Sequence, residues 1–365
     1  MVFVVCRFIK DEIKFQGYMR YYQWRNYTFI DLFLKQLHKD PQKTMFRCGE
    51  LSWTAQQFED FSNRVANYFK SEGIKRGETI CLMMDGCPEY VGIWFGLSKI
   101  GACTALINTN LRQASLIHSI NLVDGKRIIY GAEMAEETST KPQAESELKK
   151  ISTRDKFLYM YTSGTTGPSK AAIISYGRAM LIVMRPHLKL HMNDKDIVYT
   201  SLPLYHAAGG LLGVGQAFCF GSQIVIRPKF SVTSFWEDCI KYQCTVAQYI
   251  GEICRFLLAA PIQPHETQHN VRLMLGVGLK AQTWLRFVER FKVKQIGELY
   301  ASTEGNAVLV NADGKIGVVG YIPWFLRTSN QIQLIRVNLE TYEPIRDNNG
   351  LCVPCREGNQ IYLYI

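Results

Sequence analysis

The stretch that decides the fold is Phe157-Leu-Tyr-Met-Tyr161-Thr162-Ser163-Gly164-Thr165-Thr166-Gly167-Pro168-Ser169-Lys170-Ala171-Ala172. Its apolar, aromatic beginning predicts a buried strand, and the apolar pattern resumes after Lys170. The segment between Tyr161 and Pro168 contains four hydroxyl residues and two glycines. Glycines let backbone N–H groups converge on an anion, while hydroxyls and a lysine add donors and charge. The stretch therefore predicts a phosphate-binding loop. The residues expected to contact the phosphates are Thr162, Ser163, Gly164, Thr165, Thr166, Gly167 and Lys170.

The spacing of this loop differs from that of the ordinary P-loop. The ordinary motif has a glycine, four further residues and then Gly-Lys-Ser/Thr. Counted from Gly164, Ser169 stands in place of the second glycine, and Ala171 stands in place of the Mg²⁺-binding hydroxyl. A kinase or ATPase of the P-loop type is therefore disfavoured. A plain Thr/Gly hairpin turn would suit a lone Thr-Ser-Gly, but not the full string.

The composition is that of a globular protein with sizeable cores. The chain has 365 residues, of which 47% are hydrophobic, and a formal net charge of +10. Such a charge suits an anionic substrate, a membrane surface or nucleic acid. No Lys/Arg-rich tract has interleaved aromatics, so we expect no nucleic-acid partner. The eleven scattered cysteines predict free thiols, and the one CxxC, Cys352-Val-Pro-Cys355, is a weak indication of metal or redox chemistry.

Short β-type runs alternate with helical patterns along most of the chain, which predicts βαβ units, largely parallel sheets and an α/β fold. Residues 1–26 show no clear periodicity of apolar residues and are expected to be irregular. Residues 132–150 are polar and predict a surface linker. The expected strands are 79–84, 103–107, 127–131, 171–175, 197–201, 222–227, 244–249, 271–276 and 295–300. A first helix is expected to begin at Thr28 and to end before Pro41. Further helices are expected at about 54–72, 88–100 and 113–120.

The segment from Ile197 to Ile226 contains no Asp, Glu, Lys or Arg, and His206 is its one histidine. Its length alone would let it span a bilayer. Pro203 and several glycines divide it, however, into a strand, a loop, a short helix and a second strand. We therefore favour a buried interior stretch over a transmembrane helix.

From about Tyr27 to Gly358 the chain resembles the fatty acid transport protein group of very-long-chain acyl-CoA synthetases, within the adenylate-forming superfamily. The phosphate loop and the Tyr-x-x-Thr-Glu string ending at Glu304 are diagnostic of adenylation. Further segments that carry the resemblance are Ala105-Leu-Ile-Asn-Thr-Asn-Leu111-Arg112, Leu202-Pro-Leu-Tyr-His206, Phe235-Trp236, Val246-Ala-Gln-Tyr-Ile-Gly-Glu-Ile-Cys254-Arg255, Gly276-Val-Gly-Leu279 and Gly297-Glu-Leu-Tyr300-Ala-Ser-Thr303-Glu304.

The resemblance implies a role for each residue of the candidate site. Glu304 would ligate the Mg²⁺ that bridges the ATP phosphates, as suits a hard cation. Thr303 would hydrogen-bond the α-phosphate, and Tyr300 would lie against adenine. Gly276 and Gly278 would let adenine approach the backbone, with an ordinary strand-end turn as the alternative. His206 would lie beside the acyl carboxylate, with a satisfied core histidine as the alternative. Relatives usually have glycine where this chain has Ala301, whose methyl group would crowd the loop.

The implied activity is that of a long-chain fatty acid–CoA ligase, linked to fatty acid uptake. ATP and Mg²⁺ would activate long-chain or very-long-chain fatty acids to an acyl-adenylate, and coenzyme A would take the acyl group. The family implies association with the endoplasmic reticulum or plasma membrane, with the active region facing the cytosol. The expected protein partner is a second copy of the chain or a full-length paralogue. Residues 203–226 and 245–258 are candidate walls of an acyl tunnel. The alternative is a non-catalytic lipid-binding or regulatory protein.

The resemblance implies the large N-terminal domain of the adenylate-forming fold over residues 27–365, with stacked subdomains at roughly 27–150 and 151–340. The family's N-terminal membrane segment is expected to be absent. So is the small C-terminal domain with its catalytic lysine. On that expectation adenylation would be impaired and thioester formation would fail.

Overall fold

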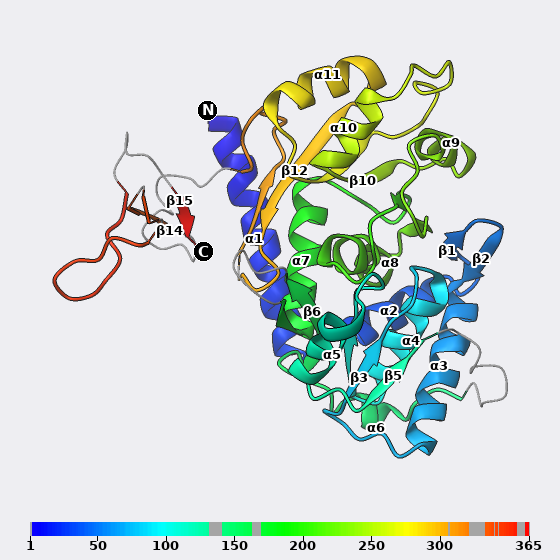
Figure 1. The fold of residues 1–365 in the computed structure, drawn as a ribbon. Coiled ribbons are helices and arrows are strands. Elements are labelled where there is room, and N and C mark those ends of the chain that lie inside the picture. The colour runs from blue at the N-terminus through cyan, green and yellow to red at the C-terminus, as the bar shows by residue number, and fades with distance from the viewer. Residues whose placement is uncertain are drawn as a thin grey trace.

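A computed structural model of the protein describes residues 2–130, 141–162, 169–305, 307–320, 333–338, 340–341, 343–355 and 362–364. Two β-sheets with helices packed around them form the main body, and a small two-stranded sheet near the C-terminus lies apart from it in Figure 1. The small sheet pairs β14 (Gln333–Ile335) with β15 (Tyr362–Tyr364).

The larger sheet has eight strands, and its six central strands are parallel. The two edge strands, β13 and β2, are antiparallel to their neighbours. In spatial order the strands are β13 (Val308–Asn311), β12 (Gln295–Ala301), β11 (Leu273–Val277), β10 (Val246–Ile250), β8 (Ile197–Thr200), β9 (Gln223–Ile226), β1 (Thr44–Cys48) and β2 (Leu51–Thr54).

The smaller sheet has five strands, four of them parallel, and ends in an antiparallel hairpin. In spatial order they are β5 (Arg127–Ile129), β3 (Thr79–Leu82), β4 (Cys103–Leu106), β6 (Lys156–Thr162) and β7 (Lys170–Ser175). The prediction of an α/β fold with largely parallel sheets is confirmed.

Helices connect the strands, as parallel pairing requires. They are α1 (Val2–Trp24), α2 (Phe29–Lys39), α3 (Ala55–Ser71), α4 (Pro88–Lys99), α5 (Gln113–Leu122), α6 (Glu145–Leu148), α7 (Tyr176–Lys189), the π-helix η1 (Ala208–Gly213), α8 (Gly215–Phe220), α9 (Ser234–Lys241), α10 (Gly251–Ala259) and α11 (Ala281–Phe291). Helix α6 lies within the expected linker at 132–150, of which residues 132–140 fall outside the described part of the chain.

Local signals set the starts of the first helices. At α2, the Asp31 carboxylate accepts hydrogen bonds from the backbone N–H and the hydroxyl of Thr28, both at 2.7 Å. At α3, Thr54 and Gln57 form a reciprocal capping box, with distances of 2.8 and 3.2 Å. Pro88 occupies the first turn of α4, where no intrahelical donor is needed.

The N-terminal segment corrects one expectation. Residues 1–26 were expected to be irregular, but Val2–Trp24 forms a continuous helix, which packs on α7 along one side of the molecule (Figure 1). Phe15 and Met19 are buried on one side of α1, whereas Ile13 and Trp24 are exposed on another. Because apolar residues occur on both faces, the single apolar stripe that identifies a surface helix is blurred.

One aromatic core joins the two sheets. Phe218 on α8 stacks on Phe95 of α4 with ring centroids 4.7 Å apart, and it also contacts Trp94. Phe157 of β6 and Phe46 of β1 belong to the same fully buried cluster, although their strands lie in different sheets. The two sheets therefore share a hydrophobic interior.

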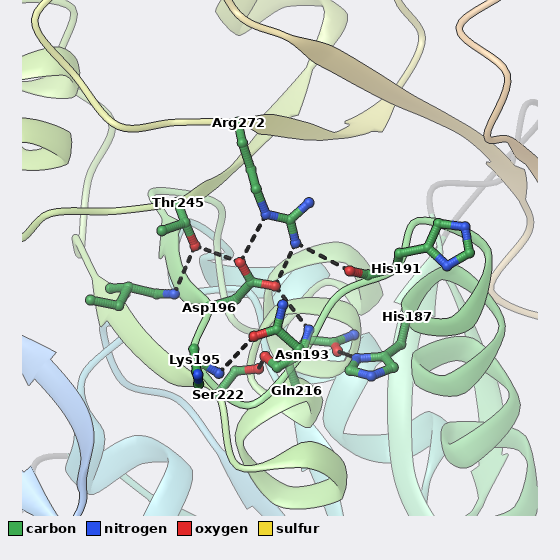
Figure 2. A network of polar contacts seen from close by, with 10 residues as sticks. His187, His191, Asn193, Lys195, Asp196, Gln216, Ser222, Thr245 and Arg272 are labelled. Atoms are coloured by element: carbon green, nitrogen blue, oxygen red, sulfur yellow. Dashed lines mark hydrogen bonds and ion pairs between the residues drawn. The ribbon is translucent and has the colours of Figure 1, made fainter.

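A polar network ties together the amino ends of the larger sheet's strands (Figure 2). Asp196, which is buried just before β8, accepts 2.6 and 3.1 Å hydrogen bonds from Arg272 and a 2.7 Å bond from Thr245. Arg272 precedes β11 and Thr245 precedes β10. The network therefore fixes the edge of the sheet opposite to the one that carries the candidate site.

The uncharged segment at 197–226 forms β8, a loop, η1, α8 and β9, as the sequence predicts. Among the described helices, none combines the length and the apolar character needed to cross a bilayer.

Candidate active site

The loops that follow the parallel strands of the two sheets meet one another. Ligands of open α/β sheets bind at the carboxyl ends of the strands, so this is where a site is expected. Leu204, after β8, approaches Gly86, after β3, so closely that a Cβ at Gly86 would lie 3.0 Å from the leucine. Other contacts between the two edges are Tyr205 with Asn110, Met160 with Gly210, and Lys229 with Asp85 at 3.8 Å. The two carboxyl edges face each other.

Both ends of the predicted phosphate loop lie on the β6–β7 hairpin. Thr162 ends β6, Lys170 begins β7, and the two residues are paired. Ser163, Gly164, Thr165, Thr166 and Gly167 lie outside the described residues. The described end of the loop is supported by α5, because His118 Nε2 lies 3.1 Å from the carbonyl oxygen of Ser169. Lys170 is exposed, as a lysine that meets a soluble anion should be.

The Tyr-x-x-Thr-Glu string occupies the carboxyl end of β12 and the loop after it. Tyr300 lies in the strand and is 36% exposed, so part of the residue is accessible to a ligand. Thr303 is half-buried and Glu304 is exposed in the following loop. Ala301, the departure from the family pattern, ends β12 opposite Val308 and is exposed.

Arg178, in the first turn of α7, connects this loop to the smaller sheet. Its guanidinium donates a hydrogen bond to the carbonyl oxygen of Gly305. Burial lowers the pKa of Arg178, and the nearby carboxylate of Glu304 acts in the opposite direction. Helix α7 starts directly after β7. Lys170 therefore lies at the first residue of β7, whereas Arg178 lies just beyond its last residue. The described contacts thus join the Glu304 loop to α7 and not to Lys170 itself.

Glu298 organises the turn after β11. One carboxylate oxygen accepts the backbone N–H groups of Gly278 at 2.6 Å and Leu279 at 3.1 Å. The other accepts the hydroxyl hydrogen of Tyr249. Burial raises the pKa of the Glu298 carboxyl, while these three donors act in the opposite direction.

The two predicted glycines have different surroundings. Gly276 lies in register between Tyr249 and Glu298, so the tyrosine ring crosses above it to reach the carboxylate. A Cβ at Gly276 would meet the Tyr249 carbonyl at 2.0 Å, which by itself accounts for glycine there. Gly278 has a φ of +79°, which favours glycine, and a Cβ there would make only an ordinary contact of 3.9 Å with the backbone nitrogen of Gly251. Gly278 is therefore the position that a planar ligand could approach.

His206 lies in the loop after β8 and is exposed, so the alternative of a core histidine is wrong. Its ring lies 4.7 Å from that of Tyr205, and the surrounding protein lowers the pKa of the imidazole by desolvation. Its carbonyl oxygen accepts the N–H of Gly210 within η1. The π-helix, a rare form frequent at functional sites, thus begins beside a predicted site residue.

Two residues that support the candidate site are not among those that the sequence predicts, Glu298 and Arg178. Glu298 lies inside the quoted string that ends at Glu304, but its partners are on other strands. Arg178 lies in no motif, and its contact with Gly305 spans 127 positions. The sequence did offer one signal for Glu298, because a carboxylate inside an apolar β-type run is expected to need hydrogen-bond donors from neighbouring strands.

The fold and the facing carboxyl edges define the large domain of an AMP-binding enzyme. The model of that family, described as "AMP-binding enzyme", matches residues 33–335, and the chain belongs to this family. It is 38% identical to long-chain fatty acid transport protein 1 of Bos taurus over 93% of this chain and 58% of that protein. It is 35% identical to long-chain fatty acid transport protein 6 of Mus musculus over 91% of this chain and 59% of that protein. The chain therefore spans a little over half the length of these relatives.

Solved structures share the fold. A fatty acyl CoA synthetase of Mycobacterium tuberculosis superposes with a TM-score of 0.72 at 16% identity, covering 89% of this chain and 68% of that one. ATP-bound MatB from Rhodopseudomonas palustris superposes with a TM-score of 0.71 at 18% identity, covering 90% of this chain and 68% of that one. At these identities the likeness concerns the fold.

Proposed function

We propose that the chain binds ATP and a long-chain or very-long-chain fatty acid between the two carboxyl edges and activates the acid as an acyl-adenylate. The observation that carries this proposal is the meeting of the loops after β3 and β4 with the loops after β8 and β9. It is supported by membership of the AMP-binding enzyme family and by the relatives named as long-chain fatty acid transport proteins.

In the proposed site, the loop from Thr162 to Lys170 holds the β- and γ-phosphates and Thr303 donates to the α-phosphate. Tyr300 and the turn at Gly278 border adenine. The acyl carboxylate attacks the α-phosphorus in line, the bond to the bridging oxygen breaks, and pyrophosphate leaves with that electron pair. The protein contributes position and charge stabilisation, which are the main terms in such reactions.

Glu304 is the proposed protein ligand of Mg²⁺. Its exposed carboxylate suits a cation that usually keeps several waters and takes one or two carboxylates together with substrate phosphates. No group of three His, Cys, Asp or Glu side chains among the described residues is arranged to hold a metal, so an all-protein cage is not the form of site expected there. When bound, the ion would neutralise charge on the phosphates.

The acyl chain requires space that the packed interior does not provide between η1 and β10. Gln248 Nε2 donates a 2.7 Å hydrogen bond to Ala208, and a Cβ at Gly213 would lie 2.4 Å from Gln248 Oε1. An acyl path between the 203–226 and 245–258 segments therefore requires η1 to move. On this proposal His206, which precedes η1, would then meet the acyl carboxylate.

Further features of the proposal come from the family resemblance. Coenzyme A would be the acyl acceptor, the active region would face the cytosol at an endoplasmic reticulum or plasma membrane, and the partner would be a second copy or a full-length paralogue. The chain's positive net charge supports contact with an anionic membrane surface.

Oleate-dependent exchange of labelled pyrophosphate into ATP tests the proposal. We expect exchange that requires both Mg²⁺ and oleate, and that Glu304→Gln lowers by about tenfold or more because the metal loses its charged ligand. Glu289→Gln, an exposed acid on α11, is the matched control and should leave exchange unchanged. ATP binding without any exchange would contradict the catalytic proposal and favour the non-catalytic lipid-binding alternative.

A further inference from the structure

From Ile9 onward, where its side chains are described, helix α1 buries one face against the body. Phe15 and Met19 on this inner face are 4% and 8% exposed. Beside them, Glu12 pairs with Arg185 of α7 at 2.6 Å, and Asp11 approaches Lys189 of α7 at 4.0 Å. The acidic residues of the helix are therefore used in contacts with α7.

The opposite face carries large apolar side chains that contact solvent. Ile9, Ile13 and Trp24 fall on one stripe, since their spacings of four and eleven residues return to the same side of an α-helix. Ile13 is 68% exposed and Trp24 is 78% exposed. Tyr21 lies beside this stripe and is also exposed. A folded protein that leaves a tryptophan and isoleucines together in solvent has a surface suited to an apolar partner.

The charges on the outer face are all positive. Lys10, Lys14 and Arg20 are exposed there, and Arg25 follows directly after the helix. Over residues 9–25 the only acids, Asp11 and Glu12, point to α7. Cations interleaved with Trp, Tyr and Ile are the composition of a helix that lies in the plane of an anionic lipid interface. A protein partner would need a strongly acidic surface that also accepts these apolar groups.

We infer that the outer face of α1, defined by Ile9, Lys10, Ile13, Lys14, Arg20, Tyr21 and Trp24, binds an anionic lipid surface. This inference rests on the membrane contact proposed above and names the surface that makes it. Trp24 and Ile13 enter the boundary between headgroups and acyl chains, while the lysines and Arg20 meet the lipid phosphates and carboxylates.

Co-sedimentation with vesicles tests the assignment. The full chain should bind vesicles of phosphatidylcholine with phosphatidylserine more tightly than vesicles of phosphatidylcholine alone, and the difference should shrink at high salt. Ile13→Ser/Trp24→Ser and Lys10→Glu/Lys14→Glu should each weaken binding to the anionic vesicles about tenfold or more, since each juxtamembrane cation contributes on the order of 1 kcal/mol.

Two controls match these variants in exposure and chemistry. Ile262→Ser replaces an isoleucine that is 78% exposed, and Lys75→Glu/Lys126→Glu reverses two exposed lysines elsewhere. Both should bind vesicles like the unmodified chain. ATP binding should be the same in all of these proteins, which keeps this test separate from the nucleotide site.

The outcomes distinguish two failures. If the unmodified chain does not bind anionic vesicles, both the membrane contact and the role of α1 are overturned. If the chain binds but the α1 variants bind equally well, only the assignment to this face is overturned. A concentration-dependent dimer that Trp24→Ser dissociates, without vesicle binding, would assign the face to a second copy and overturn the inference.

Discussion

At the scale of single residues, the turn at Gly278 depends on Glu298. This carboxylate is 3% exposed and accepts hydrogen bonds from two successive backbone N–H groups. Its second oxygen is held by Tyr249, which crosses Gly276 to reach it. Removing this acceptor leaves the buried N–H of Leu279 and the buried hydroxyl of Tyr249 unpaired, which costs about 1–3 kcal/mol for each donor.

We therefore expect Glu298→Ala to weaken ATP binding about tenfold, because the Gly278 turn loses its support. Glu298→Gln keeps an oxygen acceptor for the turn and should restore most of the affinity. Calorimetric titration with ATP and Mg²⁺ measures both variants. Equal affinity for the unmodified chain and Glu298→Ala would show that the turn does not border the nucleotide.

His187 makes stability depend on pH. Burial lowers the pKa of its imidazole from 6.5 to about 4, against the opposing hydrogen bond with Gln216. Between these two values the unfolded chain binds the extra proton and the native chain does not, so stability falls as pH falls through this window. We expect about 2–3 kcal/mol of unfolding free energy to be lost between pH 7 and pH 4.5 from this group.

Urea unfolding of His187→Phe at both pH values measures this contribution. The aromatic ring can keep the stacking on Phe220, whose ring centroid lies 3.3 Å from that of the histidine. The variant should lose less stability on acidification than the unmodified chain, by about the 2–3 kcal/mol given above. The same pH dependence in both proteins would show that His187 does not carry it.

At the scale of elements, α3 and α4 pack at very short range. A Cβ added at Gly96 of α4 would lie 2.5 Å from the carbonyl oxygen of Ser62. At the same contact, the buried Lys99 ammonium lies 2.6 Å from Glu59 and 2.8 Å from the Ser62 hydroxyl. Burial lowers the pKa of Lys99, and Glu59 opposes this shift.

Gly96→Ala should destabilise the protein by about 1–3 kcal/mol, because the backbone carbonyl of Ser62 cannot move away without disturbing α3. Gly17→Ala is the matched control in α1, since nothing lies within 4 Å of its Cβ position. It should stabilise by up to about 1 kcal/mol through helix propensity. Urea unfolding compares the two, and a stabilised Gly96→Ala would contradict the described packing.

The sequence predicted those helices and strands that have a clear hydrophobic periodicity or clear capping residues. Helix α3 and strands β10 to β12 fall within a few residues of the expected ranges. The hairpin of β1 and β2 was missed because its strands are short and mixed in polarity, and it is held by pairing with β9 from a distant part of the chain. Helix α1 was missed because both of its faces carry apolar residues.

The candidate site residues were predicted from motifs. Among those that the structure describes, Thr162, Gly278 and Tyr300 lie at or just after the carboxyl ends of strands, as the βαβ pattern predicts. Their supports could not be predicted in the same way. Arg178 reaches Gly305, and Glu298 reaches Tyr249, only because distant segments are brought together by folding. Periodicity reports which face of an element is buried, but not which distant side chain it meets.

At the scale of the whole molecule, the account depends on how two sheets are held against each other. Phe218 and Phe95 join them through one core, and the Leu204 and Gly86 loops join them at the carboxyl edges. Thr162 and Lys170, which flank the proposed phosphate loop, belong to the smaller sheet. Tyr300 lies in a strand of the larger sheet, and Thr303 and Glu304 follow that strand. A single triphosphate would therefore be shared between the two sheets.

Titration of the chain with ATP–Mg²⁺ and with AMP, measured by calorimetry for the unmodified protein and Lys170→Met, tests this claim most directly. Lys170 is proposed to contact only the β- and γ-phosphates, so the variant should lose about tenfold in ATP affinity, or about 1.4 kcal/mol, with AMP binding unchanged. Lys156→Met, at the other end of the same hairpin, should bind both nucleotides normally. Equal ATP affinity in the unmodified chain and Lys170→Met would contradict the account.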